Sequence, residues 1–226
     1  MTKGLSVQKR SYTHAWLLLY FLIYMPWFGW LNIYTPQRTN ATEIYCGLDD
    51  MIPFMEIFVI PYFLWFAYIA FGFVFLFFSS RSEFIRMCTF LYTGMTICLI
   101  IYMIFPNYQT LRVDYTTLGR SNILTEAIRL LQTGDTPYNV FPSIHCLNSI
   151  GMNIALARDS WFKKHRWALA GVTVLTVLIC LSTVFVKQHS ILDGIGALIL
   201  SVPLYLISYK VPWKKLFYKI TKKECA

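Results

Sequence analysis

Two histidines and an aspartate stand at the ends of apolar segments, where polar groups are unusual. His145 follows Ser143 at the start of one such segment, and His189 and Asp193 open another. Ionisable side chains near a bilayer are costly and are usually retained for function. Two imidazoles with a carboxylate partner indicate phosphoryl transfer through a histidine nucleophile.

The spacing of these residues suggests how the chemistry is divided among them. His189 and Asp193 are four residues apart, so they share one face of a helix. The carboxylate can accept a hydrogen bond from one ring nitrogen, which leaves the other nitrogen free as the nucleophile. His145 is then the candidate general acid. The candidate ligands for the phosphate oxygens are Arg112, Ser143 and Lys187.

The composition is that of a membrane protein. Hydrophobic residues make up 57% of the 226 residues and charged residues 14%, against about 25% charged residues in average soluble domains. Mean hydropathy is +0.52. We therefore expect one integral membrane domain over residues 1–226, with the bilayer as its partner. The net charge of +9 falls in the loops and the tail, so we expect no nucleic-acid partner.

The apolar segments predict an all-α bundle of six transmembrane helices, because a span needs about 20 mostly apolar residues. The fourth segment is short and carries Asn148 and Asn153, so it should face other helices rather than lipid. Lys187 and Gln188 alone link the last two segments. The six segments are Tyr12–Ile33, Pro53–Phe78, Met87–Phe105, Ser143–Ala157, Trp167–Val186 and His189–Tyr209.

The distribution of basic residues predicts the orientation. Of the 20 Lys and Arg residues, 15 fall on the side of both termini, which predicts that both termini are cytoplasmic and that the histidines face outward. Residues 210–226 form a basic cytoplasmic tail, expected to rest on anionic lipid headgroups. The five on the other side are Arg38, Arg112, Arg120, Arg129 and Lys187.

The predicted outer loops contain two further features. Residues 106–142 should hold a short surface helix, capped by Ser121 or Asn122 and ending before Gly134. In and beside the first outer loop, Asp49 and its acidic neighbours are interpreted as solvated loop residues.

Metal ligands and cofactor motifs are not evident in the sequence. None of the six cysteines forms a C-x-x-C pair, and no carboxylate–histidine cluster has the spacing of a zinc site. We therefore expect no metal and no cofactor.

The motifs resemble those of the type 2 phosphatidic acid phosphatase superfamily, whose pattern is K-x6-R-P, P-S-G-H and S-R-x5-H-x3-D. The second motif reads Pro142 to His145 with isoleucine at position 144, and the third reads Ser182 to Asp193 with Thr183 in place of arginine. The first is the weakest match, because Phe105 replaces the lysine and valine follows Arg112. The resemblance covers about residues 105–200.

The resemblance implies a six-helix membrane bundle and a metal-independent phosphohistidine mechanism. By matching position, His189 would be the nucleophile, Asp193 its orienting partner and His145 the acid, while Ser143 and Arg112 would bind phosphate. Two basic ligands of the pattern are absent, at positions 105 and 183. Our hypothesis is that Lys187, four residues after Thr183, replaces one of them.

The expected function is a lipid phosphatase that hydrolyses a lipid phosphomonoester or diphosphate at the outer leaflet. The compact chain fits a bacterial plasma membrane. One alternative is a phosphotransferase with a lipid alcohol as acceptor, since sequences with a similar Lys-Gln-His stretch lie near sphingolipid head-group transferases. Another is a non-catalytic lipid-binding or scaffold protein. The sequence leaves the lipid, the acceptor and the oligomeric state open.

Overall fold

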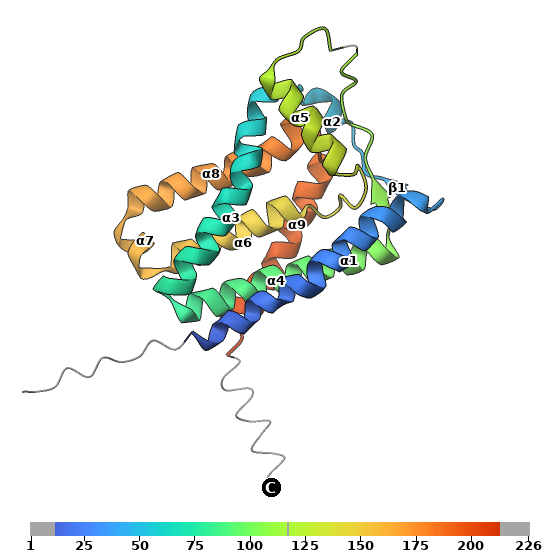
Figure 1. Ribbon diagram of the computed structural model, residues 1–226. Coiled ribbons are helices and arrows are strands. Elements are labelled where there is room, and N and C mark those ends of the chain that lie inside the picture. Colours follow the sequence, from blue (N-terminus) through green and yellow to red (C-terminus); the bar gives the residue numbers. More distant parts are fainter. Residues whose placement is uncertain (1–11, 117, 213–226) are drawn as a thin grey trace, which may run out of the picture.

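The computed structural model describes residues 12–116 and 118–212, and these form a helical bundle (Figure 1). The basic tail predicted for residues 210–226 lies mostly outside the described residues. The elements in chain order are η1 (Thr13–Tyr20), α1 (Phe21–Tyr34), η2 (Thr35–Gln37), β1 (Thr42–Glu43), α2 (Leu48–Met51), η3 (Glu56–Phe58), α3 (Val59–Ser79), α4 (Arg81–Ile104), β2 (Asn107–Tyr108), α5 (Ile123–Gly134), α6 (Ile144–Arg158), α7 (Ser160–Lys164), α8 (Arg166–Phe185), α9 (Ile191–Tyr205) and the π-helical η4 (Leu206–Lys210).

Within the described ranges, five helical stretches are long and apolar enough to cross a membrane. The chain is thus a mostly helical protein of integral membrane type. The fourth expected span is α6, whose 15 residues extend about 22 Å, less than the ~30 Å hydrocarbon core. The five stretches are Thr13–Gln37, Glu56–Ser79, Arg81–Ile104, Arg166–Phe185 and Ile191–Lys210.

Helix α6 lies at the centre of the bundle, where it packs against α3, α4, α8 and α9 (Figure 1). Gly151 permits close approach to α4, because a β-carbon there would lie 2.4 Å from the Phe90 ring. Polar side chains of α6 are buried among the helices, as the sequence predicts. Asn148 is 4% exposed, and the Asn153 side chain donates to the Thr176 hydroxyl at 3.2 Å. The helix that begins at His145 is therefore held on several sides.

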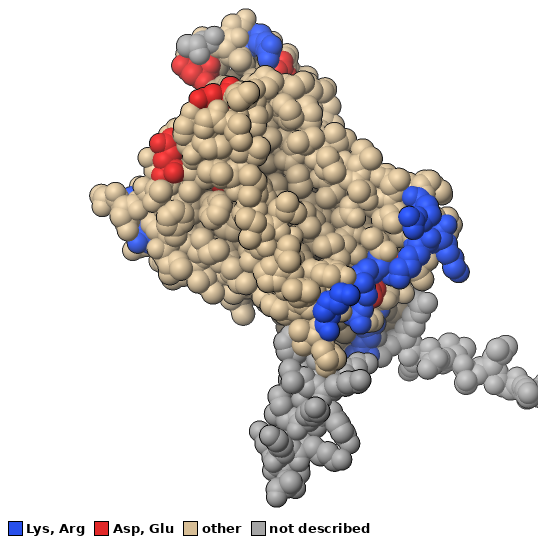
Figure 2. Space-filling model, turned by 180° about the vertical axis from the view of Figure 1, so that it is seen from behind, with Lys and Arg blue, Asp and Glu red and all other residues tan. Residues whose placement is uncertain are grey.

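The two ends of the bundle differ in charge. Figure 2 shows a band of Lys and Arg side chains at the lower right of the molecule, and Asp and Glu side chains toward the upper end, where some Lys or Arg side chains also lie. At the basic end, Arg158 lies 3.4 Å from Glu83, and its guanidinium stands 4.9 Å from the centre of the Tyr209 ring. Arg81 donates to Thr13 at this end as well. The first and last described helices therefore both reach the basic end, where each contacts α4.

The opposite end contains a small addition to the predicted all-α fold, a parallel pair formed by β1 and β2. Asn107 of β2 is fully buried, and its side-chain oxygen accepts from the backbone of Val140 and Phe141 at 2.8 and 2.9 Å. The first and second outer segments are thereby fastened to each other. This fixes the chain just before Ser143 and His145.

The predicted surface helix in the long segment is α5. Asn122 is its N-cap and forms a capping box with Thr125. The expected C-terminal boundary was one residue short, since Gly134 is the last helical residue. The inner face of α5 packs through Ile128 against Val59 and Val186, so α5 covers the end of the bundle where α8 and α9 meet.

Candidate active site

The turn between α8 and α9 positions His189 and Asp193. Ser190 is the N-cap of α9, and its side chain and that of Asp193 form a capping box. Asp193 Oδ2 accepts from His189 Nδ1 at 2.9 Å and from the Ser190 backbone at 3.1 Å. Because a carboxylate only accepts, Nδ1 carries the hydrogen and Nε2 has the free lone pair. The predicted pairing of these two residues is present.

The same pairing sets the protonation of His189. Burial in the turn favours the neutral ring, but the hydrogen bond to Asp193 and its negative charge outweigh burial, and the pKa of His189 is raised above its ordinary value. In the unliganded protein His189 therefore keeps its proton to a higher pH than a free imidazole.

His145 stands in the first turn of α6, and the structure brings it to His189 as the sequence predicts. The centres of the two rings are 5.8 Å apart, with an angle of 62° between their planes. Two aromatic rings of α3 hold His145 from the other direction. The ring centres of Trp65 and Tyr62 lie 4.3 and 4.9 Å from that of His145.

Ser143 connects the two motif segments. Its hydroxyl oxygen accepts from the Cys146 backbone at 3.3 Å, which makes Ser143 the N-cap of α6. Its own backbone N–H donates to the Asp193 carbonyl at 3.0 Å. The start of α6 is thus tied directly to the first turn of α9.

Arg112 reaches the same region from the long outer segment. Its guanidinium donates to the carbonyls of Gln132 and Asp135 at 3.1 and 2.8 Å, and to Gln188 Oε1 at 3.0 Å. Burial lowers the pKa of Arg112, while nearby Asp135 and Tyr62 act in the opposite direction. Arg112 is therefore hydrogen-bonded to Gln188, the residue that precedes His189 in the sequence.

Lys187 makes a contact that the sequence does not suggest. Its ammonium group donates to the backbone carbonyl of Asp49 at 2.7 Å, and the side chain is 9% exposed. Burial lowers its pKa, and the charges of Asp49 and Asp50 oppose that shift. The hydrogen bond of this cation is with the first outer segment. That Lys187 binds phosphate remains a prediction.

The interpretation of Asp49 as a solvated acid was wrong. Asp49 is 1% exposed, and its carboxylate accepts from the Ser190 hydroxyl at 2.6 Å and from the Ile191 backbone at 2.8 Å. A carboxylate at a helix N-terminus satisfies free N–H groups and interacts well with the helix dipole. Asp49 therefore anchors the first outer segment to α9, beside the His189 turn.

Replacing Lys187 with methionine distinguishes anchoring from phosphate binding. We expect a lower melting temperature, because the bond to the Asp49 carbonyl is lost. If Lys187 only anchors this segment, KM stays within about twofold of the parent value. Thermal unfolding and steady-state kinetics in detergent provide the two readouts. A KM raised tenfold with unchanged melting would assign Lys187 to the phosphate instead.

Thr183 and Phe105 occupy the two positions at which the motif pattern has basic residues. The Thr183 hydroxyl donates to the Cys180 carbonyl at 2.8 Å, within its own helix, and lies 3.8 Å from the Cys146 sulfur. Phe105 is 38% exposed at the end of α4. Neither position supplies a charge.

Sequence reasoning missed four residues of this cluster: Tyr62, Trp65, Asp135 and Gln188. Tyr62 and Trp65 belong to a helix with no motif, and only the fold brings them to His145. Asp135 follows the surface helix, and the charges of His189 and Arg112 both act on its carboxyl group. Burial raises the pKa of Asp135. Gln188 had a usable signal, because it precedes the candidate nucleophile.

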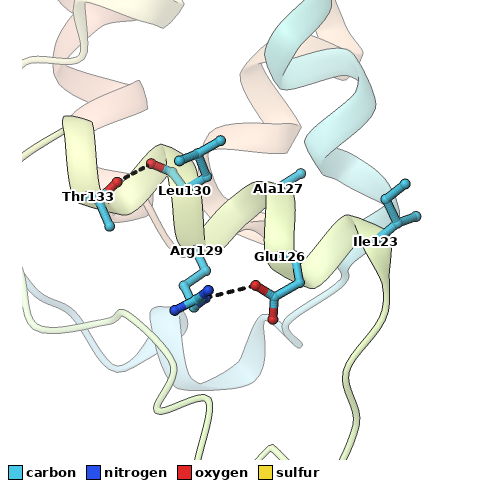
Figure 3. Close-up of a pocket in the computed structure, with 6 residues that line it drawn as sticks. All are labelled: Ile123, Glu126, Ala127, Arg129, Leu130 and Thr133. Carbon is cyan, nitrogen blue, oxygen red and sulfur yellow. Dashed lines mark hydrogen bonds and ion pairs between the residues drawn. The ribbon is translucent and has the colours of Figure 1, made fainter.

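The pocket on the surface of α5 lies apart from the cluster. A shallow pocket lies on the outward face of α5, between Ile123 and Thr133, and none of the predicted site residues lines it (Figure 3). Among the described residues, no three His, Cys, Asp or Glu side chains are grouped as metal ligands.

The comparisons with known proteins agree with this geometry. The model of the PAP2 superfamily matches residues 107–217, a range that contains Arg112, Ser143, His145, His189 and Asp193. No curated protein and no solved structure matches the chain. With the matched range covering every residue of the predicted site, the chain belongs to the PAP2 superfamily, that of the type 2 phosphatidic acid phosphatases.

Proposed function

We propose that this protein is a membrane lipid phosphatase that hydrolyses a lipid phosphomonoester or diphosphate through a phosphohistidine on His189. Proteins of the PAP2 superfamily are generally phosphoesterases. The observation that carries the proposal is the pair of imidazoles 5.8 Å apart, of which His189 is oriented by Asp193. An acid and a nucleophile at this separation can act on one phosphorus atom from two directions.

In the first step, His189 Nε2 attacks phosphorus and the bond from phosphorus to the lipid oxygen breaks. His145, in its protonated form, gives its proton to the departing oxygen. Asp193 stabilises the positive charge that develops on the His189 ring. Arg112 and the Ser143 hydroxyl bind the phosphate oxygens, whose charge is redistributed in the transition state.

In the second step, water attacks the phosphohistidine. Neutral His145 takes a proton from the water, the phosphorus–nitrogen bond breaks, and its electron pair returns to Nε2. Phosphate leaves and His145 is again protonated, ready for the next lipid. No metal ion takes part in this scheme.

We also propose that the site faces the outer leaflet of the plasma membrane, with both termini cytoplasmic and α6 as a sixth, mostly protein-enclosed helix of the bundle. The support is the charge distribution: the ends of α4, α6 and α8 remote from the histidines are the basic ones (Figure 2). Lipid tails would stay in the bilayer while the headgroup reaches the site.

A second candidate is a phosphotransferase that uses a lipid alcohol in place of water. It is favoured by the uncharged residues Phe105 and Thr183 at two positions where the phosphatase pattern has basic ligands. Released inorganic phosphate supports the hydrolase, whereas a labelled phospholipid product without free phosphate supports the transferase.

A panel of lipid phosphates, offered to purified protein in detergent, tests the proposal. We expect phosphate release at a rate that excess EDTA leaves unchanged within about twofold, because histidine and not a metal-bound water is the nucleophile. Loss of more than tenfold in EDTA, restored by a divalent cation, would contradict the mechanism.

A further inference from the structure

Several buried donors around the two imidazoles have no close hydrogen bond among the described residues. They are the Tyr62 hydroxyl, Trp65 Nε1, Arg112 Nε and Gln188 Nε2. The Tyr62 hydroxyl interacts with the Asp135 carboxyl at longer range. Tyr62 is 1% exposed and Gln188 is 3% exposed. An unpaired buried donor is destabilising, and native proteins contain few of them. A group of four at one place indicates that an acceptor binds there.

These donors lie next to the two imidazoles. Tyr62 and Trp65 lie beside His145, with ring centres 4.9 and 4.3 Å from its own and ring planes tilted by 35° and 46°. Gln188 directly precedes His189, and its amide oxygen accepts from Arg112 at 3.0 Å. Because Arg112 occupies the oxygen, the amide nitrogen of Gln188 is the end of the side chain left for a ligand.

We propose that Tyr62, Trp65 and Gln188 complete the phosphate site with neutral donors, and that the site therefore selects a phosphate group with a single negative charge. This proposal rests on the proposed function, because the acceptor is the phosphate of the lipid substrate. A phosphate oxygen can accept several hydrogen bonds, so the three neutral donors and Arg112 Nε can share one phosphate group.

The preference for a singly charged phosphate follows from the charges of the residues at the site. Among the described residues, Arg112 is the cation bonded to this cluster, through Gln188. The Lys187 ammonium is bonded to the Asp49 carbonyl, and the charges of Asp49 and Asp50 beside it offset its own. Asp193 and Asp135 add negative charge near His189. Neutral donors stabilise an anion less than cations do, so the second charge of a dianion is left uncompensated.

A singly charged phosphate has two sources, a phosphodiester and a protonated phosphomonoester. Dodecyl phosphate and methyl dodecyl phosphate represent them and share one tail. At pH 8 the first carries two charges and the second carries one, because the second pKa of a phosphate monoester is about 6. Binding is measured by tryptophan fluorescence on the full-length His189→Ala variant, which does not turn the probes over.

At pH 8 we expect the diester to bind about tenfold more tightly than the monoester, and at pH 5.5 the ratio should fall to within about threefold. Both probes bind beside the same charged and titratable groups, His145, Arg112, Asp135 and Asp193. The ratio of the two dissociation constants therefore measures the effect of the probe's charge on binding. A monoester that binds as tightly as the diester at pH 8 would overturn the selectivity.

The donors are tested by adding Tyr62→Phe to the same background, with Tyr92→Phe as the matched control. Tyr92 also has a buried hydroxyl without a close hydrogen bond among the described residues, but it lies on α4, beside Tyr20 and Cys88. We expect Tyr62→Phe to weaken both probes about five- to tenfold without lowering the melting temperature, and Tyr92→Phe to leave binding within about twofold.

Equal binding by the two variants would refute the role of Tyr62. These results are separable from the proposed function, because binding in the His189→Ala background does not depend on turnover. If the wild-type protein hydrolyses no lipid phosphate, the proposed function fails, and the binding ratios still decide whether the donors form a site for a singly charged phosphate.

Discussion

Replacing His189 with alanine will lower turnover of a lipid phosphate by at least about a thousandfold, because no other group can form the covalent intermediate. The structure holds the His189 ring by a 2.9 Å bond to Asp193 and sets it 5.8 Å from His145. The loss should appear in kcat, while KM changes little, since the phosphate ligands remain. Phosphate release under saturating substrate measures it.

His165→Ala is the control for this experiment. That ring lies in the basic region between α7 and α8, where it stacks on Trp161 with ring centres 4.2 Å apart, and it should leave the rate within about twofold. A His189→Ala protein that folds and retains a tenth or more of the activity would exclude histidine as the nucleophile.

Replacing Asp193 with asparagine will lower kcat by about a hundred- to ten-thousandfold, as expected when the carboxylate that orients a catalytic imidazole is lost. Asparagine can still accept from the Ser190 backbone, so the N-cap of α9 is retained. What is lost is the negative charge and the fixed tautomer of His189. The melting temperature should change far less than the rate does.

The pH profile gives this variant a sharper signature. His189 attacks as the neutral ring, and Asp193 raises its pKa, so the acidic limb of the rate profile lies above the pH expected for a free imidazole. Removing the carboxylate lowers the His189 pKa, and the acidic limb should move to lower pH. Phosphate release measured across the pH range gives both limbs.

Asp159→Asn is the matched control, because Asp159 is also a buried N-cap carboxylate, 2% exposed, but at the start of α7. It should leave the position of both limbs unchanged. An acidic limb that stays in place, or moves to higher pH, in Asp193→Asn would show that the limb does not report His189.

Much of the bundle could be predicted because its signals are local. Apolar length predicted the five long helical stretches. The short link at Lys187 and Gln188 predicted a turn between the last two helices, and that turn covers residues 186–190. The four-residue spacing of His189 and Asp193 predicted their contact, although His189 lies in the turn before α9 and not on the helix itself. The match of PAP2 to residues 107–217 confirms the family that the motifs indicate.

What could not be predicted depends on contacts between distant segments. Asp49 looks like a loop acid until the fold places its carboxylate on the first turn of α9. Tyr62 and Trp65 are two aromatic residues among many in α3, and no local pattern marks them as neighbours of His145. The short length of α6 was predicted, but the sequence could not decide whether a helix of 15 residues crosses the bilayer.

Trapping the intermediate tests the central claim most directly. The wild-type protein is mixed briefly with a lipid phosphate labelled with ³²P, denatured in alkali to preserve phosphohistidine, and mapped by mass spectrometry. The account predicts an acid-labile phosphate on the peptide that carries His189, absent in His189→Ala and long-lived in His145→Ala, where water is not activated. Efficient turnover without any label on His189, or a label on another residue, would contradict it.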